Sequence, residues 1–209
     1  LMDTDRIGAT IFDVFFTHWQ KTVVKEHFHN EATASAISGA SSGLASTLLA
    51  GDEAGWFCNT DRVEAIQKAM NDALAELEER LGSDMALWNW GRLHKINLQH
   101  VLSDRGDLGQ LLDRGGLPVK GNGITVCNTG YDPNYLAPMG ANYRLITDFS
   151  VEPAGLFAVD AQGISGHPGS THYCDQLDEW TNARYHFIPL DQNEVKRLSK
   201  EQMVLQPRA

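Results

Sequence analysis

The densest group of side chains that could do chemistry lies between Ser165 and Asp175. The run reads Ser-Gly-His-Pro-Gly-Ser-Thr-His-Tyr-Cys-Asp and holds hydroxyls, a thiol, two imidazoles and a carboxylate. These are the parts of a nucleophilic triad, which also needs an oxyanion hole and a base aligned on the nucleophile. Neighbours along one loop rarely supply both, and no Gly-x-Ser-x-Gly elbow is present. We expect turn-capping side chains here, and a self-contained hydrolase stays open as an alternative.

A second group of possible ligands surrounds the end of the first predicted helix. His18, His27 and His29 lie near Glu26 and Glu31. His27 and His29 are two residues apart, so on a helix they point to different faces and do not converge on one metal ion. We therefore expect solvated histidines and assign no metal ligand.

Two glycine-rich segments resemble phosphate-binding loops only superficially. Gly115-Gly116 and Gly121-Asn-Gly123 fit neither the dinucleotide fingerprint nor the P-loop pattern. The sequence predicts hairpin turns at both places. No residue of this chain is assigned as catalytic, cofactor-binding or metal-binding.

Composition narrows the possible partners. The 209 residues are 42% hydrophobic and 21% charged, which supplies a core and excludes disordered and collagen-like chains. Lys and Arg number 17 against 27 Asp and Glu, a formal charge of −10. Nucleic acids and anionic membranes require a basic surface, so neither is expected as a partner. Three dispersed cysteines without a Cys-x-x-Cys pair predict no disulfide framework, and no stretch approaches the ~20 apolar residues of a membrane span.

The first part of the chain, residues 1–87, is predicted to be helical. Apolar residues recur at steps of three and four from Asp3 to about Phe28, and a gentler segment runs from Ser42 to Ala50. The strongest pattern covers Asp61 to Leu81, with Asp61 and Glu64 arranged as in a capping box. Gly82 is suited to end that helix.

The second part, residues 88–209, is predicted to be rich in antiparallel strands. Short segments with β-branched and aromatic residues lie between Gly, Pro and Asn, at 124–128, 143–149, 155–159 and 185–190. Asp191 and Glu194 predict a short helix, and Met203–Leu205 a last strand. Helices first and strands after indicate an α+β chain rather than alternating βαβ units.

Four motifs in series carry a family resemblance. They are Trp88-Asn-Trp-Gly-Arg-Leu-His94, Gly121-Asn-Gly-Ile-Thr-Val-Cys-Asn128, Gly140-Ala-Asn-Tyr-Arg-Leu-Ile-Thr-Asp148 and the segment from Gly163 to Trp180. In order and spacing they resemble the C-terminal part of the large (beta) chain of the penicillin acylase (penicillin amidase) family. Residues 88–205 carry the resemblance well, and the preceding helices fit the family only in pattern.

The resemblance implies an N-terminal-nucleophile hydrolase with a four-layer αββα core. Such enzymes cut a precursor into two chains and use a newly exposed Ser, with its own α-amino group as base, to attack an amide. The resemblance implies that the nucleophile, the oxyanion Asn and the calcium ligands lie upstream of the matching region. Leu1 has no hydroxyl or thiol, so it is not expected to be the nucleophile. The resemblance implies no cofactor in this segment and allows calcium in the full-length enzyme. The implied partners are the small chain, the rest of the large chain and a penicillin-, cephalosporin- or acyl-homoserine-lactone-like amide.

The resemblance also sets structural expectations and leaves one alternative. Arg144 and Asp148 would form an ion pair in a core strand, and Trp88, Trp90 and His94 would shape packing near the core. A periplasmic or secreted location is implied by the family. The alternative is a non-catalytic binding or assembly module that shares this fold segment. As a fragment of an acylase, the isolated chain is expected to self-associate or to bind a hydrophobic dye.

Overall fold

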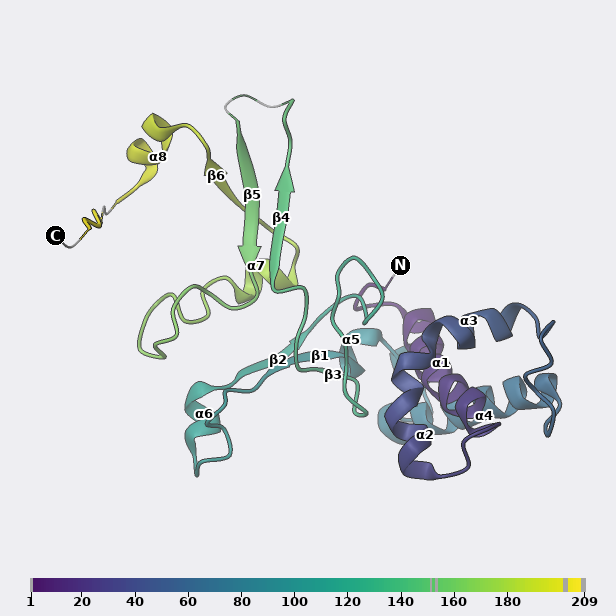
Figure 1. Cartoon of the computed structure of the whole chain (residues 1–209). Coiled ribbons are helices and arrows are strands. Elements are labelled where there is room, and N and C mark those ends of the chain that lie inside the picture. Colours follow the sequence, from purple (N-terminus) through teal and green to yellow (C-terminus); the bar gives the residue numbers. More distant parts are fainter. Residues whose placement is uncertain (1, 151, 153, 201–202, 208–209) are drawn as a thin grey trace. The chain divides into compact units, whose positions relative to one another are not determined.

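The computed structural model describes residues 2–150, 152, 154–200 and 203–207, and its chain divides into two compact units. The first unit runs from Leu1 to Lys95 and the second from Ile96 to Ala209. Figure 1 shows that the first unit is helical and that the strands come later in the chain. The two units are treated separately below.

The first unit consists of helices, with one long loop between Ala50 and Arg62. They are α1 (Ile7–Lys25), α2 (Glu31–Ser38), η1 (Gly39–Ser41), α3 (Ser42–Ala50), α4 (Arg62–Leu81), η2 (Met85–Leu87) and α5 (Trp90–Leu93). The predicted helices at 3–28, 42–50 and 61–81 are thereby confirmed, with the first one shorter at both ends. Asp61 caps α4 by accepting the N–H groups of Val63 and Glu64.

A seam of small residues lets α4 pack closely on α1. Ala65, Ala69 and Ala73 recur every four residues and are at most 2% exposed. Residues four apart share one helix face, so the three alanines form a buried seam along one side of α4. Small side chains allow a short interaxial distance, and this makes α1 and α4 the main helix pair of the unit.

Buried indole and imidazole groups complete this helical unit. The Trp19 Nε1 atom donates to the carbonyl oxygen of Ala45 at 2.8 Å, which ties α1 to α3. Trp90 and His94 are both 0% exposed and stack at 4.6 Å between ring centroids. Trp88 is also buried. The expectation that these residues shape core packing is confirmed.

The second unit contains two three-stranded sheets. The first has the order β2-β1-β3 and is formed by β1 (Lys95–Leu98), β2 (Arg114–Pro118) and β3 (Leu136–Ala137), with α6 (Leu108–Leu112) between β1 and β2. The second has the order β4-β5-β6 and is antiparallel. Its strands are β4 (Tyr143–Thr147), β5 (Gly155–Asp160) and β6 (His186–Pro189), accompanied by α7 (Leu177–Thr181) and α8 (Gln192–Leu198).

A small core joins the elements of the second unit. Its buried members are Ile96, Val119, Ala137, Val159, Ala161, Leu177 and Trp180. The Trp180 Nε1 atom donates to the carbonyl oxygen of Ala141 at 2.7 Å, so the buried indole leaves no polar group unsatisfied. The core is thus centred on α7 and the adjoining end of β5.

The α+β prediction is confirmed, and three local predictions are wrong. Residues 124–128 form a turn and bends instead of a strand, because the Asn122 and Thr125 side chains bond nearby backbone groups. Gly115 and Gly116 lie inside β2 rather than in a hairpin turn, and Gly121–Gly123 belongs to an irregular loop. Residues 203–207 contain no strand. Within the described part of the chain, every helix is too short or too polar to cross a bilayer.

Candidate functional site

The loop from Gln162 to Gln176, which connects β5 to α7, contains the polar cluster noted in the sequence. Two backbone hydrogen bonds join the two arms of this loop. At its base, Gln176 N donates to Gln162 O at 2.9 Å, and further along, Ser165 N donates to His172 O at 3.0 Å. The Gln176 side-chain oxygen accepts the N–H of Asp160 at 3.0 Å. The loop is therefore a closed structure anchored on β5. We call it the 162–176 loop.

Gly163 allows the two arms of the loop to approach. A Cβ atom at this position would overlap the carbonyl oxygen of His172 and lie 2.9 Å from the Asp175 Oδ1 atom. Only a residue without a side chain fits this close approach. The glycine thus leaves room for the His172 carbonyl oxygen and the Asp175 carboxylate beside residue 163.

His172 and Asp175 form an ion-pair geometry at the surface of the loop. The His172 Nδ1 atom lies 2.7 Å from the Asp175 Oδ2 atom, and the two side chains are 60% and 40% exposed. This is the base-and-orienter half of a triad. Such a pair becomes a catalytic device only when a nucleophile lies within hydrogen-bond reach of the imidazole.

The serine hydroxyls of the loop bind the backbone instead. Ser165 Oγ accepts the N–H of His167, and Ser170 Oγ accepts the N–H of His172, both at 3.1 Å. His167 Nδ1 accepts the N–H of Gly169 at 3.0 Å. Within residues 162–176, all of which the structure describes, no serine hydroxyl is hydrogen-bonded to an imidazole. The arrangement fits turn capping and lacks the aligned nucleophile of a triad.

The Cys174 thiol of the cluster contacts an arginine side chain. The Arg114 Nε atom lies 3.4 Å from the Cys174 Sγ atom, and the Arg114 guanidinium lies 4.7 Å from the centroid of the Tyr173 ring. The buried Tyr173 hydroxyl donates to the carbonyl oxygen of Leu112 at 2.7 Å. These contacts fasten the 162–176 loop to the segment around α6 and β2.

The expected ion pair between Arg144 and Asp148 is not formed. The Arg144 Nη1 atom donates to the carbonyl oxygen of Trp180 at 2.8 Å, and the guanidinium lies 4.2 Å from the centroid of the Trp180 ring. Asp148 lies past the end of β4 and accepts hydrogen bonds from the N–H and hydroxyl of Ser150. These two bonds lower the pKa of Asp148 below its ordinary value. The prediction failed because the strand ends at Thr147, before Asp148 can share its face.

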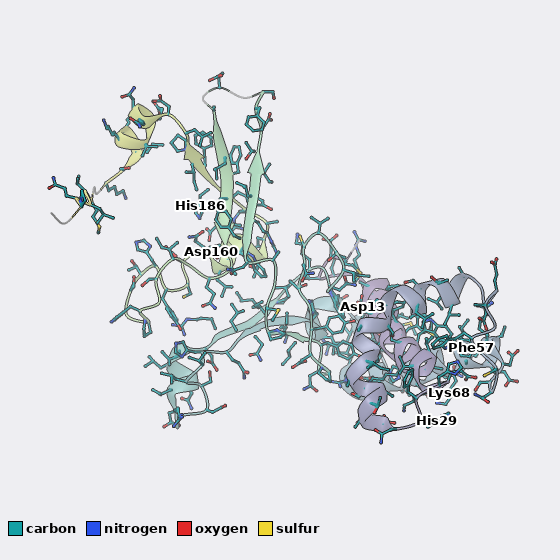
Figure 2. All side chains as sticks on the ribbon, in the orientation of Figure 1. Asp13, His29, Phe57, Lys68, Asp160 and His186 are labelled. Atoms are coloured by element: carbon teal, nitrogen blue, oxygen red, sulfur yellow. The ribbon has the colours of Figure 1, made fainter. Side chains whose placement is uncertain are left out.

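The histidines near α1 are held separately. His18 Nε2 lies 2.7 Å from Glu76 Oε2, and His27 Nε2 lies 2.9 Å from the Trp56 carbonyl oxygen. His29 is exposed in the loop that follows α1 (Figure 2). Nowhere among the described residues do three His, Cys, Asp or Glu side chains gather as possible metal ligands.

A groove of about 500 Å³ beside α1 and α4 carries both signs of charge. Three lysines and three carboxylates line it together with His18, Thr22 and Thr60; the charged residues are Lys21, Lys25, Lys68, Glu26, Glu64 and Asp72. Lys25 is already paired with Glu31 at 2.7 Å, and Lys68 with Asp72 at 2.6 Å. Because three lysines and three carboxylates line it, the groove carries no excess of either charge.

Sequence reasoning missed one polar cluster in the second unit. Ser103 Oγ donates to Asp113 Oδ1, and His100 N donates to the same oxygen at 2.8 Å. The bond from Ser103 is the main cause that lowers the pKa of Asp113, and His100 adds to it. These residues are separated by up to thirteen positions and follow no periodic pattern, so only the folded loop reveals them.

Comparisons with known proteins give the chain its context. The sequence model of the family described as penicillin amidase matches residues 1–197. An acyl-homoserine lactone acylase, QuiP, of Pseudomonas syringae pv. syringae is 31% identical over 153 residues, which cover 70% of this chain and 18% of that protein. Penicillin acylase 2 proenzyme of a Pseudomonas species is 32% identical over 139 residues, covering 65% of this chain and 17% of that protein.

Among solved structures, a thermostable penicillin G acylase from Alcaligenes faecalis is similar over 97% of this chain and 39% of its own, with a TM-score of 0.47 and 18% identity. Of the curated acylases just described, this chain spans 17% and 18% of the length.

Proposed function

Because this chain belongs to the penicillin amidase family, whose sequence model matches residues 1–197, we propose that it is part of a larger acylase. That acylase hydrolyses the acyl amide bond of a small molecule. The observation that carries the proposal is the unbroken family match, combined with a span of only 18% of the curated relative's length. A chain of this length accounts for a portion of such an enzyme and not for its whole catalytic apparatus.

In the proposed reaction, the nucleophile is an N-terminal Ser outside this chain. Its hydroxyl attacks the acyl carbonyl while the α-amino group of the same Ser takes the hydroxyl proton and passes it to the leaving nitrogen. Water then hydrolyses the acyl-enzyme and restores the Ser. The 162–176 loop supports this assignment, because its serine hydroxyls accept backbone N–H groups and neither is aligned on an imidazole.

This chain supplies scaffold in the proposed enzyme. Its helical first unit and its antiparallel β4-β5-β6 sheet are the kinds of layer that an αββα fold requires. The division at residues 87 and 88 into a helical and a strand-rich domain remains our proposal. Metal ions, including calcium, are assigned to the absent part of the enzyme, which follows the family resemblance.

The proposed substrates are N-acylated small molecules. The relatives are named for acyl-homoserine lactones and for penicillin, which share an amide between an acyl chain and a polar ring system. The pocket that selects the acyl chain is assigned to the absent part, so both substrate types are included in the test.

Intact mass and N-terminal sequencing of the natural product test the proposal. We expect a much longer chain that begins with Ser and contains this sequence near its end. The same preparation is assayed with an N-acyl-homoserine lactone and with penicillin G, and release of the free amine is expected from at least one. A natural chain that begins at Leu1 would contradict the proposal.

An assembly module without chemistry is the second candidate. The observation that favours it is the exposed apolar surface of the second unit, where Val126, Phe149 and Leu205 are each more than 85% exposed. Such surface suits a binding role as well as a scaffold role. A complete natural polypeptide that hydrolyses neither substrate, although correctly cut and folded, would favour this module.

A further inference from the structure

Residues 51–60, which lie between α3 and α4 and which we call the 51–60 loop, are held in place by two carboxylates. Four consecutive backbone N–H groups of the loop donate to these side chains. Asp52 accepts the N–H of Trp56 at 2.7 Å and that of Phe57 at 2.9 Å. Glu26, which follows α1, accepts the next two N–H groups through Oε1 at 2.9 Å and 2.6 Å. The segment is thus fixed by one carboxylate of its own loop and by one from the end of α1.

Both carboxylates hold the loop through backbone groups, while the basic side chains beside them are engaged elsewhere. Arg62 attracts the Asp52 carboxylate, but it donates its own hydrogen bonds to carbonyl oxygens at the end of α3. Lys25, next to Glu26 in the chain, is paired with Glu31 at 2.7 Å. Hydrogen bonds to an ionised oxygen are roughly twice as strong as those to a neutral one. The attachment of the loop therefore depends on the charge of these two side chains.

The aromatic side chains of the 51–60 loop cover part of α1. Phe57 stacks on Trp19 with 5.4 Å between the ring centroids, and Trp19 is 0% exposed. Figure 2 labels Phe57 among the side chains of the helical unit. The Trp56 Nε1 atom donates to the carbonyl oxygen of Val23 at 2.9 Å. Detachment of the loop uncovers one face of the Trp19 ring and breaks this bond to α1.

The contact between α1 and α4 is independent of the two carboxylates. It is formed along the alanine seam, and α1 is tied to α3 by the Trp19 indole, which donates to Ala45. Asp61, which follows the loop, caps α4 through its own side chain. The helices thus have their own contacts, and the loop can detach while they stay packed.

We propose that the 51–60 loop is an acid-released strap, which ionised Asp52 and Glu26 together hold on α1 and which detaches when both take up a proton. Because the two carboxylates bind successive N–H groups of one segment, its release is coupled to about two protons. The proposal concerns the helical unit alone and does not depend on the acylase reaction.

The direction of the pH dependence follows from the same hydrogen bonds. The N–H groups of Phe57 and Trp56 lower the pKa of Asp52 below 3.8. Burial raises the pKa of Glu26, but its hydrogen bonds outweigh burial and lower the pKa below 4.5. The carboxylates of the attached loop therefore bind protons more weakly than those of the detached loop. Attachment is complete above pH 4.5 and is lost as the pH falls through the lower pKa values of the attached state.

The other charged groups near the two carboxylates do not release the loop by gaining a proton. His27 Nε2 lies 2.9 Å from the Trp56 carbonyl oxygen, which can only accept, so the imidazole donates in its neutral and its protonated form. A proton on His27 or His18 adds positive charge, which favours the ionised carboxylates and opposes release. The remaining charged neighbours on α1, the loop and α4 are Lys21, Lys25, Glu53, Asp61, Arg62, Glu64, Lys68 and Asp72.

Hydrogen exchange followed by mass spectrometry tests the proposal on the full 209-residue chain. Exchange is measured from pH 6 to pH 3 and corrected for the intrinsic rate at each pH. Protection of residues 56–59 should fall by at least about tenfold over this range, because the detached loop binds the two protons more tightly. Protection of residues 69–77 within α4 should fall by less than about threefold, since that part of the helix stays packed.

The test variant combines Asp52→Asn with Glu26→Gln, which keeps both acceptor oxygens and removes both charges. At pH 6 its residues 56–59 should exchange at least about tenfold faster than in the wild type, without further pH dependence down to pH 3. The matched control is Glu53→Gln, because Glu53 is exposed beside Asp52 in the same loop. The control should follow the wild type within about twofold at every pH.

The single change Asp52→Asn keeps the test decisive if the double variant weakens the protection of α4 at pH 6. With one carboxylate left, the pH dependence at residues 56–59 should fall from about two protons to about one. Loss of protection in the loop and in α4 together in the wild type would overturn the proposal, because the whole unit would then be unfolding. An unchanged pH dependence in either carboxylate variant would overturn it as well, since another group would then release the loop.

Discussion

Glu26 shows how one carboxylate organises a long loop. It is 6% exposed, and its Oε1 atom accepts the N–H of Cys58 at 2.9 Å and of Asn59 at 2.6 Å. Burial alone raises the pKa of Glu26, but hydrogen bonds from Asn59, Thr60 and Cys58 outweigh burial and lower the pKa below 4.5. The ionised form is thus favoured in the folded state. Its contribution to stability is present above pH 4.5 and is lost as the pH falls through the lower folded pKa.

Replacing Glu26 by Gln should remove this pH dependence. Gln keeps one acceptor oxygen but no charge, so we expect a loss of about 1 kcal/mol at neutral pH. Below pH 4.5 the difference between variant and wild type should shrink. Urea unfolding followed from pH 3 to pH 7 checks this, with the exposed Glu53→Gln as control. A constant difference across that range would contradict the assignment.

The two loop histidines should be dispensable for chemistry. The imidazoles of His167 and His172 contact the Gly169 N–H and the Asp175 carboxylate, respectively, and no serine hydroxyl. His167→Ala and His172→Ala should therefore each reduce amide hydrolysis by the proposed acylase less than about tenfold. Initial rates at saturating substrate measure this. A fall of a hundredfold or more, with unchanged circular dichroism, would show that the loop takes part in catalysis.

At the scale of elements, the alanine seam of α4 leaves no room for larger side chains in the contact between α1 and α4. Ala69→Leu adds three carbon atoms at a position that is 0% exposed, and overpacking of this kind costs about 1 to 3 kcal/mol. Ala75 is exposed on the same helix, so Ala75→Leu is a control with the same change in helix propensity. Chemical unfolding compares the two variants. Equal stability of both would contradict a close α1–α4 contact.

Gly121 should be required in the loop between β2 and β3. Its φ is +87°, and a Cβ atom there would overlap the carbonyl oxygen of Cys127. Gly121→Ala should therefore destabilise the second unit by about 2 kcal/mol, through backbone strain and the displaced carbonyl. Gly123→Ala is the control, because its Cβ would meet only Gly130 Cα at an ordinary 3.7 Å. Hydrogen exchange of residues 96–200 measures the difference.

The helices and strands that could be predicted are those whose apolar spacing and end residues agree. The 61–81 helix was predictable because its apolar period, its Asp61 cap and Gly82 all agree. Strand 143–147 was predictable from alternation, but its end was not, and this error produced the false Arg144–Asp148 pair. Residues 124–128 have strand-forming types, yet the Thr125 and Asn122 side chains bind the backbone first. Helix α2 follows Asn30, whose side chain caps it, a signal left unused.

The candidate site was predictable in content and not in geometry. The side chains of the 162–176 loop are visible in the sequence, but their roles depend on the closure at Gly163 and on Tyr173, which reaches Leu112 sixty-one positions away. Contacts over such separations have no periodic trace in the chain. The sequence therefore located the loop, and the fold decided that its hydroxyls serve the backbone.

At the scale of the whole molecule, the two units differ in how well they bury apolar side chains. Of the 28 exposed large hydrophobic residues among those described, 22 lie after residue 95 and 6 before it. A complete domain rarely exposes so many large apolar groups together. The second unit thus has the surface expected of a piece that is covered in a larger protein.

The isolated chain should bind a hydrophobic dye. We expect 8-anilinonaphthalene-1-sulfonate to increase its fluorescence on the native 209-residue chain, and to do so much less on the larger acylase proposed above. Light scattering of the isolated chain should also reveal self-association. A monomer that leaves the dye dark would contradict the assignment of this surface to a covering partner.

The position of Trp180 makes the second unit optically distinct. The other four tryptophans, Trp19, Trp56, Trp88 and Trp90, all precede residue 95, so Trp180 is the only indole after it. It is 0% exposed, with a guanidinium 4.2 Å above its ring. Trp180→Phe removes tryptophan fluorescence from the second unit. The wild-type spectrum minus that of the variant is therefore the emission of Trp180 alone. Assembly of the proposed acylase could then be followed in real time, unit by unit, without an added label.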